Sequence, residues 1–378
     1  MKLEVTRFVC GAVPSGTGAA RAHKLQPQPS VTEHGVQQRR KILLKGALPA
    51  LCLALAVIAA LALASSAIAQ SNEDGSAAAA IAPNPPIPSA VKPSLVMQGA
   101  TYATAGIALR NRGAGNISIS GLLGAPTVAY IYWAVICPAA VCPAPATQIQ
   151  IQRLYPLPAV GPAVLPGVQI GVGPSPCWGA GNVVVFRAPV PLGIATGNGS
   201  YQITILAGGQ AIVNGSSPWG GFATPAWEGA SLVFIAPSTT GLGIVSVYDA
   251  GLAGTVFVPV PAFNYTLALP VAINPGSTTF LDNIGADGQH FIPRGAILPV
   301  SDEATTVNGV PIAGPGSQYN DSDWNGSAGF TLTELWDDTA HDFTLPSTSV
   351  TNLLNISISG TGFPADCLVT VANVVQEN

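Results

Sequence analysis

The sequence predicts an all-β protein, built as an antiparallel β-sandwich of the jelly-roll or immunoglobulin-like kind, with two sandwiches in tandem. Charged residues make up only 8% of the 378 residues, whereas the chain contains 42 Gly and 34 Pro. This composition favours short strands joined by turns and leaves little material for long amphipathic helices. The absence of helical periodicity also argues against a parallel sheet with crossover helices.

Short runs rich in β-branched and aromatic residues recur between turn signals from residue 96 onward. The clearest are residues 127–136, 182–186, 201–206, 231–235, 244–248, 255–260 and 353–359. Residues 201–205 and 355–359 alternate between apolar and polar types, as expected when one face of a sheet is exposed to solvent. Residues 183–186 are apolar throughout, so we expect them in the middle of a sandwich.

The chain is expected to divide into four parts. These are an N-terminal extension with a signal peptide or signal anchor (1–69), an Ala/Pro-rich linker (70–95) and two β-sandwiches (96–262 and 263–378). A weak internal sequence similarity supports a duplicated unit. The segment near Phe186 leads into the strand at Tyr201 much as the segment near Trp336 leads into the strand at Leu353.

Residues 39–69 predict export from the cytoplasm. Arg39, Arg40, Lys41 and Lys45 precede an uncharged stretch rich in Leu and Ala, which ends in an A-x-A cleavage site between Ala69 and Gln70. The basic run resembles a twin-arginine signal, although Ile42 stands where an aromatic residue or Leu is expected. The expected location is extracellular, periplasmic or on the cell surface.

A retained anchor is the alternative to cleavage. The uncharged stretch is longer than the roughly 20 residues that cross a bilayer, so an uncleaved leader would hold the chain in the membrane with its C-terminal part outside. Apart from this N-terminal segment, no contact with a membrane is expected.

Four cysteines follow the leader, namely Cys137, Cys142, Cys177 and Cys367. In an oxidising compartment they can form two disulfides, for which three pairings remain open. Cys137 and Cys142 are near enough in sequence to close a small loop. No His lies close to them, which disfavours a zinc site.

The part of the chain after Ala69 is acidic, because it holds six Lys and Arg residues against sixteen Asp and Glu. Its net charge is therefore about −10, and ten of the acids lie between residues 282 and 342. Such a surface repels phosphate backbones, so a nucleic-acid partner is not expected.

Residues 321–326 read Asp-Ser-Asp-Trp-Asn-Gly, a D-x-D-x-N-G spacing. This spacing can direct the oxygens of Asp321, Asp323 and Asn325 toward one hard cation, and it predicts a calcium site with no other cofactor. The EF-hand pattern does not continue, since Leu332 stands at its twelfth position. The alternative is a polar turn held by Asx hydrogen bonds.

Five tryptophans lie beside Gly or acidic residues, a context typical of exposed rings that bind sugars or partner proteins. They are Trp178, Trp219, Trp227, Trp324 and Trp336. Buried anchors at the corners of sheets are the alternative interpretation.

The sequence assigns no catalytic residue. It contains no G-x-S-x-G, H-E-x-x-H, P-loop or G-x-G-x-x-G motif, and only His290 and His341 follow the leader. The acids of residues 282–342 leave a carbohydrate-active hydrolase with paired carboxylates as an alternative, since glycoside hydrolysis needs only two suitably spaced acids.

Several short segments between residues 97 and 375 carry a family resemblance. In order they are Ala129-Tyr130-Ile131-Tyr132-Trp133, Cys177-Trp178-Gly179, Glu228-Gly229-Ala230-Ser231-Leu232-Val233, Asp287-Gly288-Gln289, Leu335-Trp336-Asp337 and Asp366-Cys367-Leu368-Val369. Together they resemble exported bacterial β-sandwich domains of unknown function, found in modular surface proteins beside adhesin-like repeats. The resemblance implies a secreted or cell-surface protein and carries over no catalytic residue.

These observations favour a non-catalytic secreted or surface-attached protein that binds a glycan or a protein. Enzyme status stays open, with the paired-carboxylate hydrolase as one alternative. A purely structural role in the cell envelope is the other.

Overall fold

The computed structural model describes residues 90–175, 181–206, 224–249, 255–258, 263–286, 303–314, 324, 326, 328, 335–345, 350–360 and 366–378. All of them belong to one unit of the chain, Ser65–Asn378. They form strands β1 to β19 in four antiparallel sheets, with one short 3-10 helix, η1 (Ala144–Thr147). The predicted all-β sandwich architecture is confirmed.

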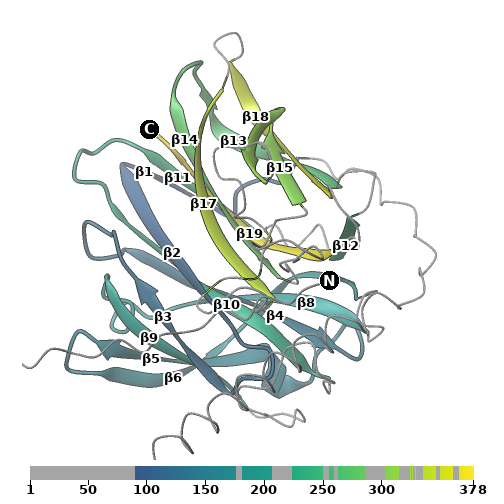
Figure 1. Cartoon of the computed structure of the whole chain (residues 1–378). Coiled ribbons are helices and arrows are strands. Elements are labelled where there is room, and N and C mark those ends of the chain that lie inside the picture. Colours follow the sequence, from purple (N-terminus) through teal and green to yellow (C-terminus); the bar gives the residue numbers. More distant parts are fainter. Residues whose placement is uncertain are drawn as a thin grey trace, which may run out of the picture. The chain divides into compact units, whose positions relative to one another are not determined.

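Two sheets form the first sandwich. Sheet 1 has the order β3 (Ala114–Ile119), β9 (Gly199–Ile205), β5 (Gln148–Tyr155) and β6 (Val160–Pro166). Sheet 2 has the order β2 (Ala100–Ala108), β10 (Ala226–Pro237), β4 (Val128–Cys137), β8 (Asn182–Pro189) and β7 (Val168–Pro174). Figure 1 shows the strands of sheet 1 beneath β10, β4 and β8.

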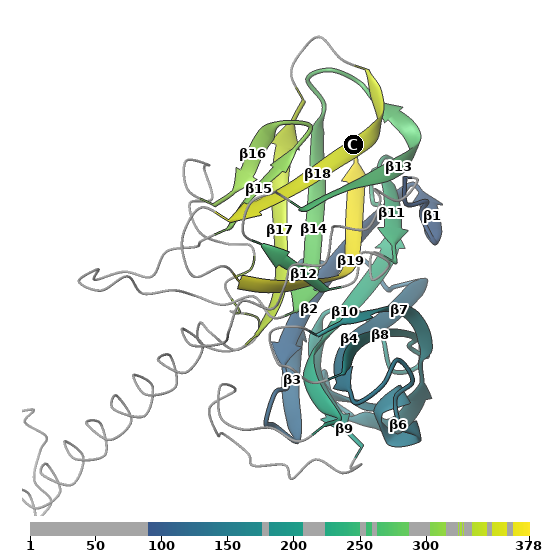
Figure 2. The same ribbon diagram turned by 90° about the vertical axis from the view of Figure 1, so that its right-hand side faces the viewer.

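The other two sheets form the second sandwich. Sheet 3 has the order β1 (Leu95–Gln98), β11 (Ile244–Tyr248), β19 (Asp366–Glu377), β14 (Thr278–Ala286) and β17 (Trp336–Thr344), and β12 (Thr255–Val258) also pairs with β19. Sheet 4 has the order β13 (Phe263–Ile273), β18 (Thr351–Gly360), β15 (Glu303–Val307) and β16 (Val310–Ala313). Figure 2 shows β13, β15 and β18 passing in front of β14, β17 and β19.

Three apolar cores separate the four sheets, so the sheets stack as four layers. Successive residues of one strand face different cores. On β10, Phe234 packs between sheets 1 and 2 while Val233 packs between sheets 2 and 3. On β19, Val374 packs between sheets 2 and 3 while Val375 packs between sheets 3 and 4. Sheets 2 and 3 are thus covered on both faces.

This layering explains the two kinds of strand in the sequence. β10 is buried from Ala226 to Ala236 because its sheet has no wet face. In β18 the buried residues alternate with exposed ones, because only one face of sheet 4 is covered. Apolar runs such as residues 183–186 therefore lie in an inner sheet packed between two others.

The two sandwiches share one topology. The neighbour orders β2-β10-β4-β8 and β3-β9-β5-β6 of the first correspond to β11-β19-β14-β17 and β13-β18-β15-β16 of the second. Corresponding strands also follow one another in the same order along the chain. The weak internal sequence similarity involves corresponding elements, since β8 leads to β9 and β17 leads to β18. The chain therefore contains the same eight-strand unit twice.

The change from the first eight-strand unit to the second falls between β10 and β11, in residues 238–243. By hydrogen bonding, β1, β11 and β12 belong to sheet 3. Only Gly99, with a φ of 60°, separates β1 in sheet 3 from β2 in sheet 2. The sequence-based ranges 96–262 and 263–378 for separate domains stay a prediction.

Candidate functional site

A polar groove of about 660 Å³ lies on sheet 4. Its floor includes side chains of the exposed face of that sheet, contributed by β13, β18, β15 and the turn after β15. Besides Tyr265 and Thr351, six of the lining residues carry neutral hydrogen-bonding side chains: Asn264, Thr266, Thr306, Asn308, Asn355 and Ser357. We call these six residues the polar array.

Strand register arranges the polar array in two rows across the sheet. In one row, Ser357 of β18 lies between Asn264 of β13 and Thr306 of β15. In the other row, Asn355 lies beside Thr266 of β13, and its carbonyl accepts a hydrogen bond from the backbone N–H of Asn308 in the turn after β15. Alternation along each strand brings these side chains to one face, because residues two apart in a strand point the same way.

Hydrogen bonds hold the centre of the polar array in place. Thr266 Oγ1 donates to Asn355 Oδ1 at 2.9 Å, and the Asn355 backbone N–H donates to Asn308 Oδ1 at 2.8 Å. Asn308 Nδ2 in turn donates to the Leu353 carbonyl at 3.1 Å. Asn308 has a φ of 49°, a conformation that Asn tolerates better than most residues. The rotamers of Asn355 and Asn308 are therefore fixed before any ligand arrives.

The chemistry of the groove is that of a neutral ligand site. Among the lining residues that the structure describes, none is charged. Amides and hydroxyls both donate and accept hydrogen bonds, so they match groups that do the same, above all the hydroxyls of a sugar.

A second polar cluster, which we call the carboxyl cluster, lies between sheets 2 and 3. Thr104 Oγ1 of β2 donates a short hydrogen bond to Asp282 Oδ2 of β14. Asp338 of β17 lies beside Ser231 and Trp336, since a Cβ built on Gly106 of β2 would come within 3.0 Å of all three side chains. Trp336 Nε1 donates to Ser231 Oγ at 3.0 Å. Two carboxyl groups from the acidic stretch, Asp282 and Asp338, thus lie in one cluster with Thr104 and Ser231.

Gly229 of β10 has no side chain, and this leaves space for the Trp336 ring against sheet 2. A Cβ built on Gly229 would overlap the Trp336 ring, and the Trp336 side chain is fully buried. This close approach of β17 to sheet 2 brings Asp338 to Ser231.

Burial raises the pKa of Asp338 to about 7, although its contacts with Ser231 and Thr104 act in the opposite direction. Burial, and then the charges of Asp282 and Asp338, hold the pKa of Tyr102 well above its ordinary value. The Tyr102 phenol therefore stays protonated at neutral pH.

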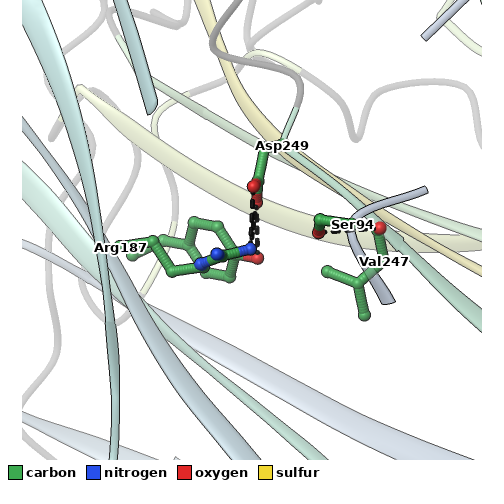
Figure 3. A network of polar contacts seen from close by, with 5 residues as sticks. Ser94, Arg187, Val247 and Asp249 are labelled. Carbon is green, nitrogen blue, oxygen red and sulfur yellow. Dashed lines mark hydrogen bonds and ion pairs between the residues drawn. The ribbon is translucent and has the colours of Figure 1, made fainter. Parts of the chain in front are cut away.

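A third polar cluster joins the same two sheets elsewhere (Figure 3). Arg187 Nη1 of β8 bonds Asp249, the residue after β11, at 2.7 Å and 3.0 Å. The Tyr132 hydroxyl of β4 donates to Asp249 Oδ1 at 3.1 Å, and the Arg187 guanidinium lies 4.9 Å from the centre of the Tyr130 ring. The side chains of Arg187 and Asp249 are 23% and 19% exposed. This ion pair is partly open to solvent.

The described tryptophans are core side chains. Trp227, Trp324 and Trp336 are only 2%, 1% and 0% exposed, so the expectation that they present open rings to a ligand is not met. Gly229 and Gly285 leave room for the rings of Trp336 and Trp324, since a Cβ at either glycine would overlap the ring. Trp178 and Trp219 lie outside the described residues.

One predicted disulfide is present, between Cys137 and Cys142. It closes a short loop at the end of β4. Cys177 lies outside the described residues, and Cys367 lies in β19 with a side chain that is not described. The pairing of these two cysteines stays a prediction.

The predicted calcium ligands Asp321, Asp323 and Asn325 lie outside the described residues. Within the part of the chain that is described, no three His, Cys, Asp or Glu side chains group as metal ligands. The leader and its cleavage site at Ala69 and Gln70 also lie outside that part. No helix among the described residues is long and apolar enough to cross a membrane.

Sequence reasoning missed both the polar array and the carboxyl cluster. The sequence did contain a signal for the polar array, because the alternation of residues 355–359 assigns Asn355 and Ser357 to the solvent-exposed face of a sheet. Polar residues on a wet face are ordinary, however, and their partners on β13 and β15 are distant in sequence. For Thr104 and Ser231 the sequence carried no signal, since isolated hydroxyls occur in many strands.

Comparison with known proteins identifies no relative by sequence. No family model matches the chain, and no curated protein matches it. Solved structures with some likeness include the ANX1 and ANX2 ectodomains from Arabidopsis thaliana, each at 7% identity and a TM-score of 0.22, with coverage of 75% of this chain and 82% of theirs. The infectious bursal disease virus Gx strain structure has 10% identity and a TM-score of 0.18, covering 77% of this chain and 75% of that one. At these TM-scores the likenesses carry no argument about this chain.

Proposed function

We propose that the protein is an exported, non-catalytic binding protein whose ligand site is the polar array on sheet 4. The observation that carries this proposal is the pair of cross-strand rows of neutral amides and hydroxyls in the groove. Export is supported by the leader sequence and by the disulfide between Cys137 and Cys142, a bond typical of oxidising compartments.

A glycan is the ligand class that fits the groove best. A sugar offers several hydroxyls on a rigid ring, and each can both donate to and accept from an Asn or Thr side chain. The acidic mature chain disfavours a strongly anionic ligand. The array is prearranged by its own hydrogen bonds, which lowers the entropy lost on binding.

The test is a glycan array probed with the mature chain, followed by titration of a bound glycan with two variants. Asn355→Ala removes the centre of the polar array. Gln202→Ala is the matched control, because Gln202 lies on β9, the strand of sheet 1 that corresponds to β18, between Asn116 and Gln152.

We expect Asn355→Ala to weaken binding by about tenfold, the equivalent of one or two lost hydrogen bonds, and Gln202→Ala to leave it unchanged. Equal losses in the two variants would place the site elsewhere. If the folded protein bound none of the glycans on the glycan array, the proposal of a glycan ligand would be refuted. A pull-down that captured a protein through Asn355 would then favour a protein ligand.

A second candidate function is a secreted hydrolase that uses two acids of residues 282–342. The presence of Asp282 and Asp338 in the carboxyl cluster favours it, since two carboxyl groups are the minimum for glycoside hydrolysis. Polysaccharide turnover that disappears in Asp338→Asn would support this function. Absence of turnover across a broad panel would leave binding, or a structural envelope role, in its place.

A further inference from the structure

The polar array on sheet 4 has a regular geometry, with three columns of side chains on neighbouring strands. Each column holds two side chains, which lie two residues apart along the chain and therefore point to the same face of the sheet. Strand register places the three columns side by side. The columns are Asn264 and Thr266 on β13, Ser357 and Asn355 on β18, and Thr306 and Asn308 on β15 and the turn after it.

The spacing of the columns fits a ligand that runs across the strands. Neighbouring columns are about 4.8 Å apart, the distance between paired strands, whereas the two side chains of one column are about 6.8 Å apart along the strand. The first spacing is close to the length that one sugar ring adds to an extended β-1,4-linked glycan, and the second is clearly longer. Such a glycan can place one ring over each column only when it lies across the strands.

The polar array ends after the third column on both sides. Beyond β15, the row that contains Thr306 continues to Pro311 of β16, whose side chain has no hydrogen-bonding group. The row that contains Asn308 continues to Gly309, which has no side chain. On the other side, β13 is the last strand in the order of sheet 4. Within the described part of sheet 4, the polar array therefore matches three rings.

The groove has to bind through several rings, because each of its contacts is weak. One neutral hydrogen bond raises affinity by only about fivefold. The aromatic side chain among the described lining residues is Tyr265, which is 2% exposed and donates through Oη to Asn373, so it offers no open face on which a sugar could stack. The contacts of one ring with one column would not offset the freedom that a single sugar loses on binding.

We propose that the polar array binds an extended, neutral β-1,4-linked glycan that lies across β13, β18 and β15 with one sugar ring over each column. The proposal rests on the proposed function, because it specifies the linkage and direction of the glycan in the same site. Asn355 in the central column accepts from Thr266 Oγ1 and donates through its backbone N–H to Asn308 Oδ1. The three columns are thus held in register before the glycan arrives, which lowers the entropy lost on binding.

The first test measures affinity against the length of the ligand. The mature chain is titrated with oligosaccharides of one to six units from the β-1,4-linked glucose and N-acetylglucosamine series. In at least one series, affinity should rise by about tenfold with each added unit up to three and by less than about twofold with each unit after that, because a fourth ring has no column to contact. The α-1,4-linked glucose series is the control for chain shape. Its chain curves, so its three-unit member should bind at least about tenfold more weakly.

The second test uses Asn264→Ala, a variant in the outer column on β13. A three-unit ligand should lose about fivefold in affinity, whereas a two-unit ligand should lose little, because it can occupy the columns on β18 and β15 instead. Asn355→Ala, in the central column, should weaken binding of both ligands. Asn116→Ala is the matched control and should weaken neither. Asn116 is exposed on β3, the strand of sheet 1 that corresponds to β13, and it lies beside Gln202 of β9 as Asn264 lies beside Ser357 of β18.

The outcomes separate this proposal from the proposed function. Equal affinity for one unit and for three units, or affinity that keeps rising beyond three, would overturn the three-column arrangement while glycan binding stands. The same holds if Asn264→Ala weakens two-unit and three-unit ligands equally, or if the glycan array detects ligands but no β-1,4-linked oligosaccharide binds. Failure of the proposed function would instead appear in the glycan array itself, as binding to no glycan of any linkage.

Discussion

Replacing Glu228 by Gln should destabilise the protein strongly. Arg110 and Glu228 form an ion pair between the end of β2 and β10, and both side chains are 0% exposed. Glu228→Gln keeps the shape of the side chain but removes its charge, so the buried Arg110 loses its ion pair with Glu228. Breaking a buried pair in this way costs about 3 to 5 kcal/mol, against about 0 to 1 kcal/mol for an exposed pair.

The control is Asp249→Asn, which makes the same chemical change in the partly exposed pair with Arg187. Thermal unfolding followed by tryptophan fluorescence should show a fall of about 6 to 12 °C for Glu228→Gln and no more than about 3 °C for Asp249→Asn. Replacing both Arg110 and Glu228 by Met should recover much of the loss, because neither charge of this pair is then buried. A loss below about 1 kcal/mol for Glu228→Gln would refute this account of the buried pair.

Three further outcomes are expected. Gly229→Ala should cost about 1 to 3 kcal/mol in a urea titration, because the new methyl group meets the Trp336 ring, whereas Gly193→Ala, with open space around it, should change stability little. Replacing Cys137 and Cys142 by Ser should lower stability by about 2 kcal/mol, the loop-closure value for a sequence separation of 5, and an unchanged melting curve would contradict it. If residues 321–326 bind calcium, the melting temperature should rise when calcium is added and fall when a chelator is added. Identical unfolding curves under the two conditions would refute calcium binding at these residues.

The strands with the strongest composition signal could be predicted from the sequence, whereas β14 could not. All seven predicted runs overlap observed strands, for example residues 244–248 on β11 and residues 353–359 on β18. β14 was not predicted, because it carries Asp282 and Asn283, residue types that strands usually avoid. These polar side chains are stabilised by contacts with distant strands, and no local pattern reports such contacts.

The candidate site shows the same limit. The acidic stretch was visible as composition, but the meeting of Asp338 with Ser231 depends on the packing of β17 against sheet 2. The tryptophans were misjudged as open rings for a related reason. The glycine that leaves room for the Trp336 ring is Gly229, which is distant from Trp336 in sequence, so the residues beside Trp336 carried no signal of its burial.

The repeated topology also determines how the inner sheets are covered. A single eight-strand unit on its own would leave its inner sheet uncovered, and a large apolar face of that kind is normally covered by association. In this chain each unit covers the inner sheet of the other, so the association is intramolecular and independent of protein concentration. The two units are also not bound by symmetry, so β8 carries Arg187 for an ion pair with Asp249 while the corresponding strand β17 carries Asp338.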